Sequence, residues 1–102
     1  MAYKVKLLPL ALLDLRKAKK WYREKNELLA EEFKTEVEKE VDYIGKYPYH
    51  YQQKYKELRQ SLVSRFPYAV FYLIEEERKK VIVFGVLHTS RNPEIVRLRF
   101  KK

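Results

Sequence analysis

Four side chains in the second half of the sequence could act together on a phosphate group: Arg59, Arg65, His88 and Arg91. A guanidinium fork matches two phosphate oxygens, so the arginines could hold such a group in place. Imidazole, with an unperturbed pKa of about 6.5, can give or take a proton near neutral pH. RNA cleavage without a metal ion needs both functions. One hypothesis is therefore catalytic, with Arg59 and Arg65 holding the phosphate and His88 serving as acid or base.

The same residues also fit a contact surface that performs no catalysis. A histidine at the end of a strand is more often structural than catalytic, and arginines beside a sheet more often bind a partner's acidic groups or an RNA backbone. The basic C-terminal segment adds two further arginines to this set. The second hypothesis is a target-binding surface made of Arg59, Arg65, His88, Arg91, Arg97 and Arg99.

The sequence lacks the residues for most metal sites and cofactor sites. The sequence has no Cys and two His, so neither a thiolate site nor an ordinary zinc site can be assembled. Its two glycines, Gly45 and Gly85, cannot make a glycine-rich phosphate loop. Both aspartates, Asp14 and Asp42, fall on expected helices. We therefore expect no metal ion and no cofactor.

Positive charge is concentrated in the second half of the chain. Residues 1–51 carry 11 Lys and Arg against 9 Asp and Glu, whereas residues 52–102 carry 12 against 5. A concentrated positive surface suggests a polyanionic partner, such as nucleic acid, a ribosome or an acidic protein. The alternative is that surplus lysines only keep a small domain soluble. With no apolar run near the roughly 20 residues of a membrane span, we expect a single cytoplasmic domain over residues 1–102 without membrane contact.

Apolar periodicity indicates the elements that must position these side chains. Residues 3–8 alternate as in a strand, and Pro9 is well placed to open a helix that runs to Lys25. Asn26 is a suitable N-cap for a second helix over about residues 27–46. We expect the two helices to form an αα-hairpin, with the glutamates of the second helix on a solvated outer face.

The period changes after the second helix. Residues 47–51 are expected to form a loop, in which Tyr47, Tyr49 and Tyr51 could stack on bases or pack the loop itself. Residues 55–63, 67–75 and 80–88 are predicted strands, and alternation over residues 96–100 suggests a short C-terminal strand. The predicted fold class is α+β in the order β-α-α-β-β-β, with the N-terminal strand and αα-hairpin packed on an antiparallel-rich sheet.

This order of elements and four motifs resemble the RelE/ParE superfamily of toxins from type II toxin–antitoxin systems, which includes plasmid stabilisation proteins. The resemblance covers nearly the whole chain. It implies a bacterial growth inhibitor that forms a hetero-oligomer with a cognate acidic antitoxin, whose C-terminal segment wraps the toxin. The motifs are Ala11-x2-Asp14-Leu15-x6-Tyr22, Ala30-x2-Phe33, Arg59-x5-Arg65-Phe66-Pro67-Tyr68-Ala69-Val70-Phe71-Tyr72 and Val86-Leu87-His88-x2-Arg91-x-Pro93.

The resemblance also bears on mechanism, because the superfamily contains two. RelE-like members cleave mRNA in the ribosomal A site and usually have an arginine where this chain has Ala69. ParE-like members poison DNA gyrase without known catalytic residues, commonly have a small residue there, and end the last strand with the Val-Leu-His-x2-Arg pattern. The resemblance thus favours a ParE-like toxin that binds DNA gyrase. The alternatives are a ribosome-dependent mRNA endoribonuclease, and a non-toxic nucleic-acid-binding or degenerate toxin domain.

Overall fold

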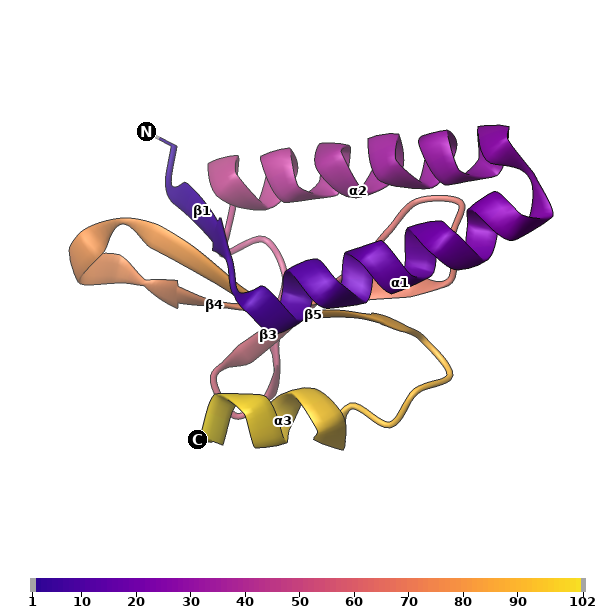
Figure 1. The fold of residues 1–102 in the computed structure, drawn as a ribbon. Helices are drawn as coiled ribbons and strands as arrows, with labels where there is room; N and C mark the ends of the chain where they lie inside the picture. Colours follow the sequence, from indigo (N-terminus) through magenta and orange to yellow (C-terminus); the bar gives the residue numbers. More distant parts are fainter. Residues whose placement is uncertain (1, 102) are drawn as a thin grey trace.

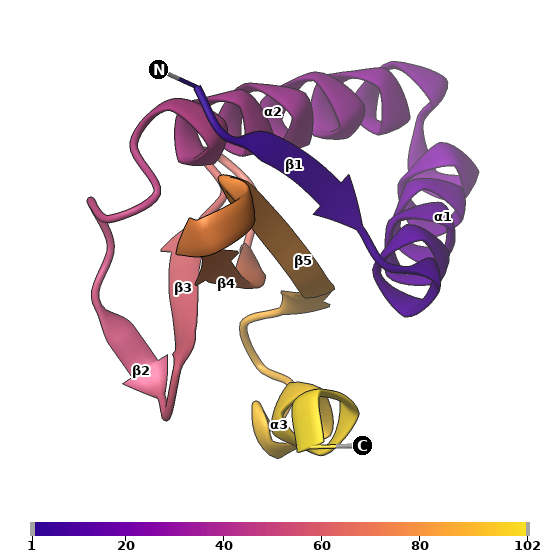
Figure 2. The same cartoon turned by 90° about the vertical axis from the view of Figure 1, so that its left-hand side faces the viewer.

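The computed structural model describes residues 2–101, without the side chains of Tyr55, Phe100 and Lys101. A five-stranded sheet carries two long helices on one face and a short C-terminal helix on the other (Figures 1 and 2). The strands lie in the order β1-β5-β4-β3-β2, with β1 parallel to β5 and the other pairs antiparallel. The predicted α+β class and antiparallel-rich sheet are confirmed. The strand bounds are β1 Lys4–Leu7, β2 Gln53–Tyr55, β3 Leu58–Leu62, β4 Tyr68–Glu75 and β5 Lys80–His88.

The αα-hairpin is built as the sequence predicts. Helix α1 (Pro9–Lys25) has its proline in the first turn, where a missing N–H costs no helical hydrogen bond. Asn26 ends α1 and starts α2 (Glu27–Lys46): its side-chain oxygen accepts a 2.7 Å hydrogen bond from the N–H of Leu28. One residue therefore separates the two helices, which fold back on each other over the sheet (Figure 1).

Two apolar cores lie on opposite faces of the sheet. The larger one, between the αα-hairpin and the sheet, contains the completely buried Phe33 and Tyr72. The smaller one contains Ala69, Leu87 and, from the C-terminal helix, the buried Val96. Because β4 and β5 contribute to both cores, their sequences are nearly continuous apolar runs.

The predicted strand over residues 55–63 is two strands. A tight turn separates β2 from β3, and its residue Lys56 has a left-handed backbone with φ of 57°. Glycine or asparagine usually marks such a turn, and the Lys56-Glu57 pair gives no such signal. The prediction of a single strand was therefore wrong because this turn is formed by residue types that are not typical of turns.

A 3₁₀ turn, η1 (Glu76–Arg78), joins β4 to β5. The predicted C-terminal strand is wrong, because its residues form helix α3 (Glu94–Lys101). The side chain of Asn92 accepts a 2.9 Å hydrogen bond from the N–H of Glu94 and so caps α3. Val96 is fully buried on the sheet while Leu98 is 60% exposed. Of the two described side chains in this apolar alternation, Val96 packs on the sheet as a strand residue would and Leu98 does not.

No helix in the described part of the chain is both long and apolar enough to cross a membrane.

Candidate functional site

The six residues of the predicted target-binding surface do not form one surface. Arg59 stands opposite Tyr72, and His88 stands opposite Tyr68, so both side chains are on the sheet face that carries the αα-hairpin. Arg97 and Arg99 belong to α3, on the other face. The sheet therefore divides the set in two.

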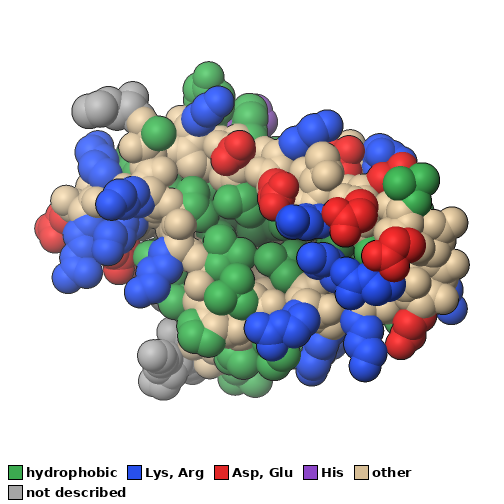
Figure 3. Space-filling model, turned by 45° about the horizontal axis from the view of Figure 1, so that its top comes forward, with side chains coloured by type: hydrophobic (Ala, Val, Ile, Leu, Met, Phe, Trp, Pro, Cys, Tyr) green, Lys and Arg blue, Asp and Glu red, His purple; other side chains and the backbone are tan. Residues whose placement is uncertain are grey.

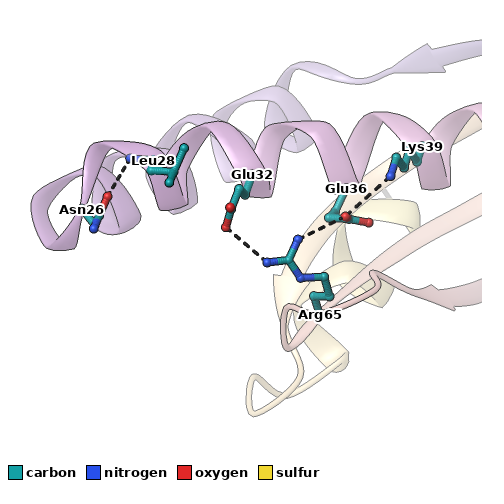
Figure 4. Close-up of polar contacts among 6 residues, drawn as sticks. All are labelled: Asn26, Leu28, Glu32, Glu36, Lys39 and Arg65. Carbon is teal, nitrogen blue, oxygen red and sulfur yellow. Dashed lines mark hydrogen bonds and ion pairs between the residues drawn. The ribbon is translucent and has the colours of Figure 1, made fainter.

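Arg65 is committed to α2 by two carboxylates. It lies in the turn between β3 and β4, with a left-handed backbone (φ 72°), and its guanidinium is 3.2 Å from Glu32 and 3.6 Å from Glu36 (Figure 4). Lys39 also approaches Glu36, at 3.8 Å (Figure 4). The expectation that the glutamates of α2 are simply solvated is wrong here, because they anchor the turn. These two carboxylates neutralise the charge of Arg65, so its attraction for a phosphate is weakened.

Arg59 is committed to the loop over residues 47–51. Its guanidinium donates a 2.6 Å hydrogen bond to the carbonyl of Tyr51 and lies 5.0 Å from the ring centre of Tyr49. The Tyr51 hydroxyl in turn donates to Glu40 at 2.7 Å, so Tyr51 serves to pack the loop. Burial and this hydrogen bond raise the pKa of Tyr51 above its usual range.

A network that we call the Glu76 cluster closes the same end of the sheet; it consists of Tyr3, Tyr49, Arg59, Glu76 and Lys79. The hydroxyls of Tyr3 and Tyr49 donate to Glu76 at 2.8 and 2.7 Å, and Lys79 also pairs with it. Hydrogen bonds from Lys79, Tyr49 and Tyr3 lower the pKa of Glu76 to about 2. Each cation of this cluster thus has a partner from the chain itself.

Arg99 is also fully engaged. Its guanidinium contacts both carboxylate oxygens of Asp14, at 2.7 and 3.1 Å, and the side chains are 17% and 10% exposed. Asp14 also accepts from the N–H of Val86, which lies beyond the end of β1 and has no strand partner on that side. A Cβ at Gly85 would stand 2.9 Å from the Arg99 guanidinium, so this glycine permits the approach. The contact joins α1 to α3, while Arg97 pairs with Glu94 on its own helix.

His88 and Arg91 do come together, in a hollow of about 570 Å³ at the end of β5 that we call the Trp21 pocket. The Nδ1 atom of His88 accepts a hydrogen bond from the N–H of Ser90, so Nε2 carries the proton of the neutral ring. The ring also packs edge-on against Tyr68, at 5.3 Å between centres. The pocket is lined by Asp14, Lys17, Ala18, Trp21, Tyr22, Pro67, Tyr68, Val86, Leu87, His88, Ser90 and Arg91.

Among residues 2–101, no cluster of three or more His, Asp or Glu side chains is arranged to hold a metal ion. The side chains that line the Trp21 pocket include two cations, an imidazole and aromatic rings.

A family model of the ParE toxin of type II toxin–antitoxin systems matches residues 5–93. The chain belongs to this family. A comparison with curated protein sequences finds no match. The family model ends just before α3, so it spans the sheet, the αα-hairpin and both His88 and Arg91.

Solved structures show the same fold at low sequence identity. The chromosomal ParDE system of P. aeruginosa matches with a TM-score of 0.75 and 12% identity, over 85% of this chain and 96% of that one. A mutant of E. coli RelE in the free state matches at 0.67 and 17%, over 97% and 94%. The RelBE2 complex of Mycobacterium tuberculosis matches at 0.61 and 18%, over 86% and 92%. These likenesses support the RelE/ParE fold predicted from the sequence.

In this ParE family member, the position of Ala69 has no room for a larger side chain. Ala69 is 1% exposed and packs in the smaller core with Leu87 and Val96, beneath α3. An arginine there would have to displace α3 or be buried without the space for its side chain.

Two residues of the Trp21 pocket, Lys17 and Trp21, escaped the sequence analysis. Trp21 directly follows the basic stretch of α1 and adjoins Tyr22, which belongs to the buried apolar stripe of that helix. Adjacent helix positions point about 100° apart, so Trp21 lies off the stripe, and it is 53% exposed. A large aromatic residue outside the apolar face of a basic helix was the signal that could have found the pocket.

Proposed function

We propose that this ParE family toxin inhibits bacterial growth by binding its target, and that the target is DNA gyrase. The dispersal of the three candidate catalytic residues carries the proposal. Arg59 holds the loop of residues 47–51, Arg65 holds α2, and only His88 faces the Trp21 pocket. A phosphate beside His88 would therefore lack both arginines that the catalytic hypothesis assigns to it.

The contact with the target is centred on Arg91, and His88 beside it supplies one of several smaller contacts. Lys17 and Arg91 are exposed, and neither forms an ion pair within the described residues, so their charges remain available to a partner. Arg97 and Arg99 contribute less, because Glu94 and Asp14 already neutralise them. An exposed arginine beside an aromatic pocket is a frequent centre of binding energy in interfaces.

A cognate acidic antitoxin is the second partner that we propose. Related folds include a ParDE system and a RelBE2 toxin–antitoxin complex. A hollow of about 360 Å³ between α1 and α2 has an apolar floor bordered by Lys and Arg side chains (Figure 3). This pattern complements an acidic amphipathic segment. The floor includes Leu12, Leu15, Phe33 and Val37, and the rim Arg16, Lys19, Arg23, Lys34 and Glu38.

Expression of the toxin alone in a bacterium tests the proposal. We expect growth arrest with loss of plasmid supercoiling and DNA breaks, intact mRNA, and rescue by co-expression of an acidic protein encoded beside the toxin. Arg91→Ala should abolish the arrest, while Arg78→Ala, which removes an exposed arginine from η1, should preserve it.

His88→Ala separates binding from cleavage in the same assay. A binding toxin should remain largely active, because it loses one contact of several. A ribonuclease that uses His88 as its acid or base should lose about 100-fold or more in rate. Cleaved mRNA together with an inactive His88→Ala variant would establish RNA cleavage, and absence of any arrest would establish a non-toxic domain.

A further inference from the structure

The Trp21 pocket combines an aromatic wall with a cationic rim. The wall is formed by Trp21, Tyr22, Tyr68 and Pro67. Trp21 is 53% exposed; Tyr22 meets its ring edge-on, and the Lys25 ammonium lies 4.9 Å from the ring centre. At about 570 Å³, the hollow lies within the roughly 300–1,000 Å³ typical of small-molecule sites. The exposed part of the Trp21 ring offers stacking to a planar ring.

The rim contains three side chains that can donate hydrogen bonds to an anion. Lys17 and Arg91 are positively charged and form no ion pair within the described residues. His88 has its proton on Nε2, because the other ring nitrogen accepts from Ser90, so it too can donate. Fixed charges of one sign around a hollow attract the opposite charge.

The one carboxylate in the wall does not cancel this charge. Asp14 receives both guanidinium nitrogens of Arg99 and the N–H of Val86. The pair is therefore neutral as a unit, and Asp14 is not available to Lys17 or Arg91. The pocket thus keeps its surplus of positive charge.

We infer that the Trp21 pocket binds one nucleotide unit, with the base against the aromatic wall and the phosphate at Lys17, His88 and Arg91. A phosphate alone would leave the aromatic wall unused, and an acidic peptide carries charge without a ring to stack. A base joined to a phosphate uses both halves of the pocket. This binding goes beyond the proposed toxin function and does not require RNA cleavage, DNA gyrase or an antitoxin.

Trp21 is the single tryptophan of the chain, so the fluorescence of the intact protein reports directly on the pocket. We expect AMP to quench this fluorescence saturably. Adenosine and inorganic phosphate, each lacking half of the ligand, should require concentrations at least about tenfold higher. Two results would overturn the inference: a short polyglutamate peptide that quenches the fluorescence as strongly as AMP does, or AMP that quenches it no more than inorganic phosphate does at the same concentration.

Two pairs of variants locate the binding. Lys17→Ala and Arg91→Ala should each weaken AMP binding about tenfold or more and leave adenosine binding nearly unchanged, because they remove only phosphate contacts. The matched controls are Lys20→Ala, an exposed lysine on the same helix, and Arg78→Ala on η1; neither residue lines the pocket. If the controls weaken AMP binding as much as their counterparts, the attraction is only general charge and the inference fails.

Oligonucleotides identify the source of the nucleotide unit. If the pocket takes a nucleotide within a single strand, a short DNA or RNA oligomer should bind more tightly than AMP, with or without a terminal phosphate. If it takes a free nucleotide, the oligomer should bind no better than AMP. Growth arrest is measured separately, so a toxin that arrests growth but does not bind AMP would refute this inference and leave the proposed function standing.

Discussion

The two ends of the sheet use the same kinds of side chain in opposite ways. In the Glu76 cluster, tyrosines and cations surround a carboxylate, and each donor has a partner within the chain. In the Trp21 pocket, aromatic rings and cations surround an open space, and Lys17 and Arg91 form no ion pair within the described residues. The difference teaches that the position of a carboxylate, and not the composition of a region, decides whether its cations stabilise the fold or remain available for binding.

One ion pair accounts for the difference in charge between the Trp21 pocket and the Glu76 cluster. Asp14 lies in the wall of the Trp21 pocket and could neutralise its cations, as Glu76 does at the other end. It is instead held by Arg99, which reaches it from α3. The C-terminal helix, which the family match does not include, thereby preserves the charge of a pocket on the opposite face of the sheet.

Breaking this pair should have the largest effect on stability. Asp14→Ala removes a nearly buried carboxylate, which deprives the N–H of Val86 of its acceptor and leaves the guanidinium of Arg99 with a 3.1 Å hydrogen bond to the Phe84 carbonyl but no counter-charge. We expect the free energy of unfolding, measured by urea denaturation, to fall by about 2–4 kcal/mol.

The control for this change is Asp42→Ala, which removes an exposed aspartate from α2. It should alter the free energy of unfolding by no more than about 0.5 kcal/mol. Equal losses for the two variants would mean that Asp14 contributes only through its helix and not through Arg99.

A pair of arginine substitutions tests the comparison directly, with an intermediate effect on stability. Arg59→Ala loses a hydrogen bond to the Tyr51 carbonyl and the contact with the Tyr49 ring, so it should lower the free energy of unfolding by about 1–2 kcal/mol. Arg91→Ala should change it by less than about 0.5 kcal/mol, because the guanidinium forms no ion pair within residues 2–101.

The two substitutions should affect growth arrest in the reverse order to stability. Growth arrest should survive Arg59→Ala, provided the protein remains folded, and should be lost in Arg91→Ala. A toxin inactivated by Arg59→Ala at unchanged stability would place Arg59 in the target contact, and the division between the two ends of the sheet would then be wrong.

The elements were predictable where short-range patterns determine them. The first-turn Pro9 and the cap Asn26 act on their own helix, so α1 and α2 begin and end where the sequence indicates. Helix α3 was missed because its apolar residues alternate, and because its decisive contact, from Arg99 to Asp14, joins residues 85 positions apart. No local pattern contains that information.

The site was only partly predictable for the same reason. The sequence showed that Arg59, Arg65, His88 and Arg91 could act on phosphate, but not which of them already have partners. Arg65 meets Glu32 from 33 positions away, and this pairing removes it from the candidate site. Residue type thus indicates the available chemistry, while long-range pairing decides where it is free to act.

Acid should produce the smallest effect, confined to the Glu76 cluster. Because hydrogen bonds lower the folded-state pKa of Glu76 to about 2, from an ordinary value of 4.5, its ionised form stabilises the folded state above pH 4.5. That contribution decreases as the pH falls from 4.5 toward 2.

We expect the urea midpoint of Glu76→Gln to lie slightly below that of the wild type at pH 7, and the gap between the two midpoints to narrow between pH 4.5 and pH 3. Glu77→Gln, an exposed neighbour in η1, should show no such gap. A gap that stays constant down to pH 3 would mean that Glu76 acts through hydrogen bonds that its charge does not strengthen, and the contrast between a carboxylate-centred cluster and an open pocket would lose its electrostatic basis.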